Sequence, residues 1–181
     1  MFPLYTVAII DKETWNAVQE EFDRRKKFMQ RHGTDRYSYG SECYPFCEKI
    51  FCGECGSLFT RHSWKSRGIV QWQCKNHRKD GKVACTNAYV DNANLENGFV
   101  KAFNRLVSER EKHMERWNAM KADGTPLEKI RAVQMMEATE NGQLQKYVPE
   151  AAQLVLEEIT IFGAKKYEFA FLEGSRVKVS V

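Results

Sequence analysis

Cys52-Gly53-Glu54-Cys55-Gly56 is the stretch around which this 181-residue chain is expected to fold, together with Cys74 and Cys85 downstream. Two cysteines separated by two residues and followed by glycine form a tight turn, because glycine allows backbone conformations that aim both thiolates at one metal ion. The 18 residues before Cys74 are enough for a β-hairpin, and the ten between Cys74 and Cys85 let the last loop double back. The spacing therefore predicts four ligands around one metal.

Four thiolates in a tetrahedron suit Zn²⁺. Zinc binding worth about 10 to 16 kcal/mol can stabilise a sheet that buries little apolar surface. A closed four-thiolate site leaves no open position for water, so we expect one structural zinc ion and not a catalytic one. The competing interpretation is four buried, unligated cysteines, but the glycine turn favours ligands.

Two other pairs of side chains compete for the metal. Cys43 and Cys47 form a C-x3-C pair that could replace Cys74 or Cys85, but they lack the glycine turn and are expected to be ordinary thiols. His62 and His77 could each replace a cysteine. Because the four-cysteine set is complete without them, we expect them to contact phosphate or to be exposed.

Short apolar or alternating runs at 49–51, 58–63 and 69–74 predict a small antiparallel sheet around the ligands, and Asp80-Gly81 predicts a turn. Later β-rich runs at 155–162, 167–172 and 176–181, with a turn at 173–175, predict closing strands.

Helical patterns flank the ribbon. Asp11 is a candidate N-cap for a helix over 11–30 with an apolar face of Trp15, Val18, Phe22 and Met29. A second helix begins at Asp91 or Asn92 and is expected to pack against the ribbon or the last strands. Its apolar face comprises Leu95, Phe99, Ala102, Phe103, Leu106 and Val107. Thr125 and Pro126 begin a shorter third helix.

The predicted fold class is α+β: a small four-cysteine zinc β-ribbon flanked by helices, with a C-terminal antiparallel β-hairpin. We place a domain boundary in the polar, aperiodic stretch near residue 40. Residues 1–40 then hold helix 11–30 and a linker. Residues 41–181 hold the ribbon, a helical insertion at 92–145 and closing strands at 155–181.

The first ten residues, Met1 to Ile10, are apolar but lack a basic leader and a cleavage site, so they are expected to form a buried strand or loop. No apolar run approaches the roughly 20 residues that span a bilayer. We therefore expect a cytoplasmic, nucleoid-associated protein without membrane contact, in a reducing compartment where cysteines are thiols or metal ligands.

Positive charge is concentrated in the ribbon. Eight Lys or Arg and two acidic residues lie between Lys49 and Lys82, a net charge of +6, and the rest of the chain carries −2. Such cations with an aromatic side chain can neutralise phosphates and contact sugar or base. The competing interpretation is a solvated basic surface. The candidate DNA-binding residues are Arg61, His62, Trp64, Lys65, Arg67, Lys75, His77, Arg78, Lys79 and Lys82, joined by Arg24, Arg25, Lys26 and Lys27 at the end of the first helix.

These residues also carry a family resemblance. The runs 45–56, 72–76 and Cys85-Thr86-Asn87, with the following helix, resemble the zinc β-ribbon domain of large serine recombinases. The run from Ile9 to Trp15, with Val18-Gln19, resembles the end of the preceding DNA-binding domain of that family. Segments 155–159 and 171–174 resemble its closing strands, so the resemblance spans nearly the whole chain.

The resemblance implies double-stranded DNA at attachment sites as partner, with other recombinase subunits as further partners and no small-molecule substrate. It implies a bacterial or phage source and a mobile genetic element. No segment of the resolvase Tyr-x-Arg-x-Ser type occurs. We therefore expect a non-catalytic module for DNA integration and recombination, a C-terminal fragment without the catalytic serine domain.

Two other functions compete with this one. The alternative is a zinc-stabilised protein-interaction module, in which helices between Leu95 and Leu144 bind another recombinase subunit. The family often carries a long coiled coil there, but the Gly124-Thr125-Pro126 interruption makes one doubtful. A zinc hydrolase is disfavoured because the chain has no His-Glu-x-x-His motif or open three-ligand set.

Overall fold

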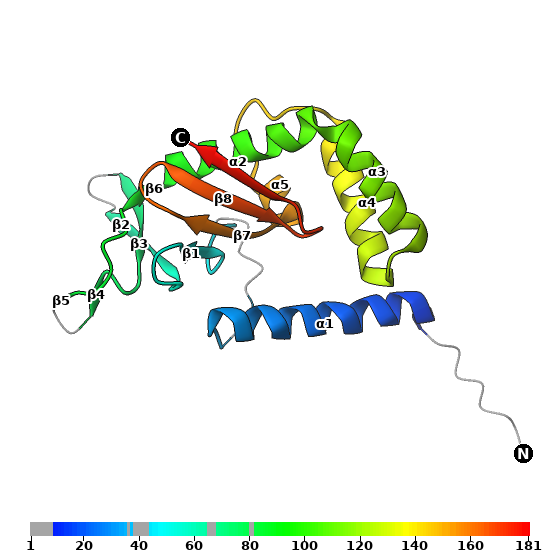
Figure 1. Cartoon of the computed structure of the whole chain (residues 1–181), viewed down its shortest axis with the longest axis horizontal. Coiled ribbons are helices and arrows are strands. Elements are labelled where there is room, and N and C mark those ends of the chain that lie inside the picture. Colours follow the sequence, from blue (N-terminus) through cyan, green and yellow to red (C-terminus); the bar gives the residue numbers. More distant parts are fainter. Residues whose placement is uncertain (1–8, 36, 38–43, 65–67, 80–81) are drawn as a thin grey trace, which may run out of the picture.

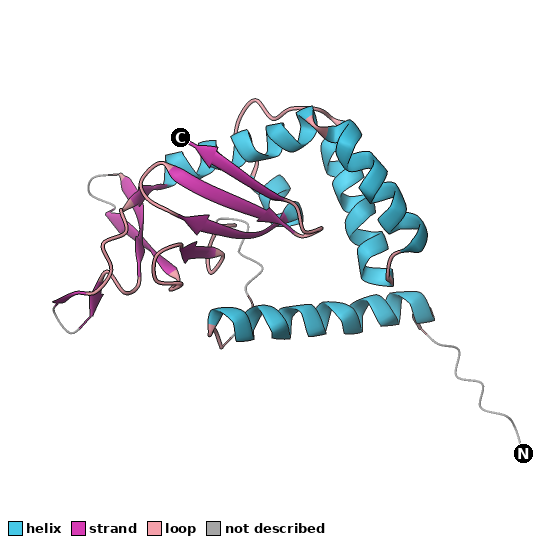
Figure 2. Ribbon diagram, in the orientation of Figure 1, coloured by secondary structure: helices cyan, strands magenta, loops and turns pink. Residues whose placement is uncertain are grey.

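The computed structural model describes residues 9–35, 37, 44–64, 68–79 and 82–181. In these residues the strands lie together and the helices flank them, as Figures 1 and 2 show. The helices are α1 (Lys12–His32), α2 (Asn92–Ser108), α3 (Arg110–Asp123), α4 (Pro126–Glu140) and α5 (Pro149–Val155). The strands are β1 (Ile50–Cys52), β2 (Phe59–Trp64), β3 (Ile69–Cys74), β4 (Arg78–Lys79), β5 (Lys82–Val83), β6 (Val90–Asp91), β7 (Leu156–Ile161), β8 (Lys166–Phe171) and β9 (Arg176–Ser180). The α+β prediction is confirmed.

The zinc ribbon is built on three antiparallel strands in the order β2-β3-β6. Phe59 lies opposite Cys74 and Trp64 opposite Ile69, so β2 and β3 form the predicted hairpin. Strands β4 and β5 pair within the loop between the last two cysteines. The predicted turn at Asp80-Gly81 lies outside the described residues.

The closing strands form a second sheet, in the order β1-β7-β8-β9. Strands β7, β8 and β9 are antiparallel, and the predicted turn at 173–175 joins the last two. Strand β1 pairs with β7 in parallel, with Cys52 opposite Ile161. The prediction that run 49–51 joins the small antiparallel ribbon sheet is wrong: apart from one bridge between Phe51 and Leu58, β1 pairs in the C-terminal sheet, and β6 is the third strand of the ribbon sheet. The pairing with β7 attaches the first zinc turn to the C-terminal sheet.

Helix α2 covers the C-terminal sheet with the predicted apolar face. Leu95, Phe99 and Phe103 are almost fully buried, and Phe99 meets Phe169 of β8 with ring centroids 6.3 Å apart. Gly98 brings the helix close, because a Cβ there would meet the Phe169 ring at 3.1 Å. This packing confirms that the face of α2 lies against the last strands.

Helices α3 and α4 form an antiparallel pair beside the sheet (Figure 1). The second helical pattern breaks at Glu109, the residue between α2 and α3. Thr125 and Pro126 begin α4 as predicted, and Thr125 and Glu128 form a capping box. The short helix α5 was not predicted; it ends at Val155, where the sequence predicted a strand.

Helix α1 begins at the predicted cap, because the Asp11 side chain accepts a hydrogen bond from the Thr14 backbone N–H. The predicted apolar face is wrong: Trp15 is 54% and Phe22 57% exposed. The reason is that α1 docks with a mixed face that buries Glu21 and Phe28 instead. Ile9 and Ile10 are also exposed, so they are not buried as expected; residues 1–8 lie outside the described residues.

Two buried carboxylates fasten α1 to the rest of the molecule. Glu21 pairs with Arg24 and Arg25 at 2.8 Å and with Arg131 of α4 at 3.1 Å. These ion pairs favour the mixed face of α1 over the apolar one, because a buried carboxylate needs cationic partners.

The second carboxylate is Glu158 of β7. It contacts His32 at 2.8 Å, Arg31 at 3.2 Å and Arg176 of β9 at 2.9 Å. The His32 ring also stacks on Phe51, with centroids 3.7 Å apart. The C-terminal end of α1 is thereby attached to β7 and to the neighbouring edge strand β1 of the C-terminal sheet.

Replacing Glu21 with glutamine is expected to destabilise the protein at neutral pH. Burial raises the pKa of Glu21, but hydrogen bonds from Arg24 and Arg25 outweigh burial and lower the pKa to about 2. The stabilisation is thus present above the unfolded pKa, about 4.3, and lost as pH falls through the folded value. We expect Glu21→Gln to lower the free energy of unfolding by about 2 kcal/mol at pH 7, less than for a fully buried pair.

Urea unfolding of both proteins between pH 7 and pH 2 measures this effect. The difference between Glu21→Gln and the parent chain should shrink below about pH 4.3; taking the difference cancels any loss of metal common to both. Asp23→Asn, on an exposed residue of α1, is the matched control. A difference that stays constant down to pH 2 would contradict the ion-pair explanation.

Candidate metal centre

The four predicted ligands come together. The Sγ atoms of Cys52, Cys55, Cys74 and Cys85 all lie within 4.8 Å of one another. Cys52 and Cys85 are 3.7 Å apart and Cys55 and Cys74 are 3.4 Å apart, close to the roughly 3.8 Å edge of a tetrahedron with 2.3 Å Zn–S bonds. The donor set fits a structural zinc ion.

The first ligand pair is shaped by its two glycines in different ways. The Gly56 backbone N–H donates to the Cys52 carbonyl at 2.9 Å, and Gly56 adopts φ +72, a left-handed conformation that favours glycine. At Gly53 the requirement is space, because a Cβ would collide with the Phe162 ring. The Gly53 N–H donates to the Ile161 carbonyl at 2.8 Å, which fastens the turn to β7.

The second ligand pair is held by the end of β3 and the following loop. The His77 backbone N–H donates to the Cys74 carbonyl at 2.9 Å. The Ala84 N–H donates to the His77 carbonyl at 3.1 Å, which brings Cys85 back toward the first pair. The predicted doubling back of this loop is confirmed.

Asn87 supports the ligands from behind. Its Nδ2 donates to Cys52 Sγ at 3.1 Å and to the Ile161 carbonyl at 2.8 Å, and the residue is 1% exposed. A hydrogen bond to a thiolate fixes its orientation and stabilises its negative charge. Sequence reasoning missed this role, and the only signal was an amide side chain two residues after the last ligand.

The thiol pKa values differ across the cluster. Burial raises the pKa of Cys55, but the Ser57 backbone N–H and the Cys74 thiol outweigh it, so the pKa falls to about 7. Burial raises the pKa of Cys85 to about 11 and also raises that of Cys74. Ligands bind zinc as thiolates, so metal binding must release protons and zinc affinity must fall as pH is lowered.

Replacing Asn87 with leucine is expected to weaken zinc binding by 10- to 100-fold, because outer ligand partners of this kind typically contribute that much. Competition with a chromophoric chelator measures the affinity. Asn76→Leu is a control of the same type: the Asn76 side chain hydrogen-bonds Ser57 Oγ, and only its backbone N–H, which the substitution keeps, contacts a ligand sulfur, that of Cys74. Equal zinc affinity in Asn87→Leu and the parent would contradict a supporting role for Asn87.

The rival ligands are outside the cluster. Cys47 is a half-buried free thiol, and Cys43 lies outside the described residues. His62 hydrogen-bonds Thr60 and stacks on Trp64, and His77 packs against Tyr89. Among the described residues, only the four predicted cysteines form a metal-binding group.

The candidate DNA-binding residues of the ribbon fall into three groups. Lys75, Arg78 and Lys82 are exposed, and Trp64 is 42% exposed. Arg61 is half-buried, with its guanidinium 4.0 Å from the centre of the Tyr44 ring. Lys65 and Arg67 lie outside the described residues, as does the side chain of Lys79.

The four cations of α1 also differ in their surroundings. Arg24 and Arg25 are engaged by Glu21, and Arg24 also pairs with Glu157 at 2.9 Å. Lys26 and Lys27 are exposed. The structure therefore presents the two lysines to solvent and engages both arginines in ion pairs, and the pair of Arg24 with Glu157 joins α1 to β7.

Four cysteine ligands on a small antiparallel sheet define a zinc β-ribbon. Residues 45–104 match the family model of the recombinase zinc beta ribbon domain, a stretch that includes every ligand. Comparison with curated proteins and with solved structures gave no significant match. The family match confirms the predicted resemblance to the C-terminal region of a recombinase and, with the cysteine cluster, supports one structural zinc ion.

The match to the recombinase zinc beta ribbon domain also has consequences for catalysis and for binding partners. The recombinase zinc ribbon is a non-catalytic module, which agrees with a closed four-thiolate site. A recombinase domain implies interaction with DNA in general. In the described residues, no helix is both long and apolar enough to cross a membrane.

Proposed function

We propose that this chain is the zinc-dependent DNA-binding module of a site-specific serine recombinase that recognises attachment-site DNA during integration. The family match over residues 45–104 carries the proposal, because it joins the zinc site to the most basic part of the chain. Cleavage of DNA is then the task of a separate catalytic serine domain. The division near residue 40 separates the end of the preceding domain from the ribbon.

Electrostatics supports the ribbon as the contact surface. Lys75, Arg78 and Lys82 are exposed on β4, β5 and the loop that they share with the zinc ligands. Exposed cations bind phosphates through release of condensed counterions, and an exposed aromatic side chain such as Trp64 can contact sugar or base. Zinc positions these side chains; the cations make the contacts.

Titration of a fluorescent duplex at increasing salt tests the proposal. We expect log affinity to fall linearly with log salt, and Lys75→Ala and Arg78→Ala each to reduce the magnitude of the slope by about one. Lys121→Ala is the control, because this exposed lysine lies in α3, outside the ribbon. Absence of DNA affinity even at low salt would refute the proposal.

A zinc-stabilised protein-interaction module is the second candidate function. Helix α2 buries its apolar face internally, so it does not offer that face to a partner. The observation in favour of this candidate is instead the exposed stripe of Trp15, Val18 and Phe22 on α1. If this stripe joins two copies of the chain, light scattering will give a mass that rises with protein concentration. The Phe22→Ser variant will then keep the mass of the monomer at every concentration.

A further inference from the structure

A polar cavity lies where α2, α3 and the start of β9 meet. Its volume is about 470 Å³, and its charged lining residues are Arg105, Glu109, His113, Arg116, Arg176 and Lys178. Counting His113 as neutral, the lining carries four positive charges and one negative charge. This excess of cations lies outside the zinc ribbon, and the DNA-binding proposal does not use it.

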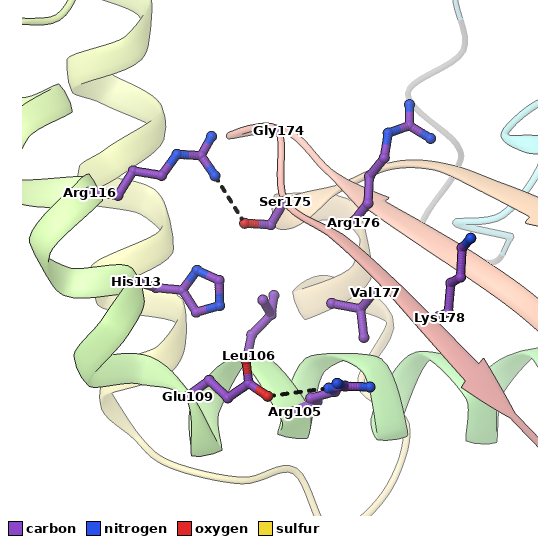
Figure 3. A pocket seen from close by; sticks show the side chains of 10 residues that line it. All are labelled: Arg105, Leu106, Glu109, His113, Arg116, Gly174, Ser175, Arg176, Val177 and Lys178. Carbon is purple, nitrogen blue, oxygen red and sulfur yellow. Dashed lines mark hydrogen bonds and ion pairs between the residues drawn. The ribbon is translucent and has the colours of Figure 1, made fainter.

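The side chains differ in how far their charge is already neutralised. Arg176 pairs with Glu158 and Glu168, and Lys178 lies 3.6 Å from Glu168. Figure 3 shows both side chains rising from β9, away from the His113 ring. The positive charges of Arg176 and Lys178 are therefore largely neutralised by Glu158 and Glu168 of the C-terminal sheet.

Arg116 and Arg105 are placed differently. Arg116 donates to Ser175 Oγ at 3.3 Å and to the backbone carbonyl of Glu173, and both acceptors are neutral. Arg105 contacts Glu109 through Nε at 3.3 Å. In Figure 3 these two guanidinium groups lie on opposite sides of the His113 ring.

The turn between α2 and α3 shapes the cavity. Helix α2 ends at Ser108 and α3 begins at Arg110, so the negative dipole end of α2 and the positive end of α3 lie together there and largely cancel. No side chain caps the start of α3. His113 stands one turn further on, with its ring stacked on Trp117 at 5.4 Å between centroids, which holds it facing the cavity.

We propose that this cavity binds a phosphate group, held between Arg105, Arg116 and His113 at the start of α3. Guanidinium groups suit phosphate because their N–H donors match its oxygens. The phosphate is either a free ion or part of a DNA strand. Binding does not depend on the ribbon's own affinity for DNA.

The test is a titration of the zinc-loaded, isotope-labelled protein with inorganic phosphate at constant ionic strength, followed by NMR. We expect saturable shifts of the backbone signals of His113 and Ser175. Arg105→Gln should weaken binding and Glu109→Gln should strengthen it, each by roughly three- to tenfold, as expected for one charge at about 6 Å in a water-like medium. Glu109 makes no side-chain cap, so its replacement leaves α3 intact.

Two matched variants control for general charge effects. Lys121→Gln and Glu111→Gln change exposed charges of α3 that do not line the cavity, and both should bind phosphate like the parent. Absence of saturable shifts would overturn the proposal, as would equal affinity in Arg105→Gln and Glu109→Gln. Saturable binding of a glutamate-rich peptide with no response to phosphate would overturn it as well.

A second arm with duplex DNA identifies the source of the phosphate. If a duplex shifts the same signals and inorganic phosphate competes with it, the cavity holds a backbone phosphate. If inorganic phosphate alone shifts them, the ligand is a free phosphate. Either result supports the site, and because the first arm uses no DNA, its outcome is separate from that of the ribbon proposal.

Discussion

Replacing Cys52 with serine is expected to release zinc, unfold the ribbon and abolish DNA binding together. Cys52 is 3% exposed, and its Sγ lies 3.7 Å from that of Cys85. Structural zinc contributes about 10 to 16 kcal/mol to folding in small domains. The small sheet β2-β3-β6 has few buried side chains of its own, so this loss exceeds what it can absorb.

The effect should be confined to one part of the molecule. Cys52, Cys74 and Cys85 belong to the same hydrophobic cluster as α2 and β7 to β9, but Phe99 also packs on Phe103 and Phe169 without a ligand between them. Far-UV circular dichroism should therefore retain most of its helical signal, while the NMR signals of β2 and β3 lose their dispersion. Native mass spectrometry measures the bound zinc, and duplex titration measures DNA binding.

Cys47→Ser is the matched control for this experiment. Cys47 is a free, half-buried thiol outside the ligand cluster, so the variant should keep its zinc, ribbon and DNA affinity. A Cys52→Ser protein that had lost zinc and still bound DNA normally would refute the link between the metal and the binding surface.

Replacing Phe99 with alanine is expected to destabilise the protein by about 3 to 5 kcal/mol, because truncating a buried aromatic leaves a cavity. Phe99 is fully buried, and its ring lies 6.4 Å from that of Phe46, 5.8 Å from that of Tyr147 and 6.3 Å from that of Phe169. It thus joins α2, the segment before β1 and the C-terminal sheet. Chemical denaturation of the zinc-loaded protein measures the change.

Ile130→Ala is the control for loss of apolar volume from a helix. Ile130 is 43% exposed on α4, so its truncation should cost less than about 1 kcal/mol. If Phe99→Ala were no more destabilising than Ile130→Ala, α2 would not be packed as the structure describes. Its apolar face would then be available to a protein partner, in favour of the second candidate function.

Several elements were predictable because their signals are local. The cap of α1 at Asp11, the capping box at Thr125 and the hairpin between β2 and β3 all follow from residues that are near one another in the chain. Helix α5 was missed, because strand-forming residues follow it directly and its seven residues give too short a period to recognise.

The candidate DNA-binding residues could be chosen by charge but not by environment. The pairing of Glu21 with Arg24 and Arg25 is local, since they are three and four residues apart on one helix. Only the fold adds Glu157 to Arg24 and Arg131 to Glu21, and leaves Lys26 and Lys27 exposed. The contribution of each to DNA binding stays a prediction. The charge of a side chain can be read from the residue type, whereas its partners in distant parts of the chain depend on the fold.

The zinc site follows from local sequence alone, because chelation depends on the spacing of Cys52, Cys55, Cys74 and Cys85 and on the glycine turn of the first pair. Tertiary structure decided where that site is attached and what surrounds it. The parallel pairing of β1 with β7 joins residues more than a hundred positions apart, and the face of α1 depends on Arg131. Such choices follow from the fit between distant surfaces, which no local pattern of residues records.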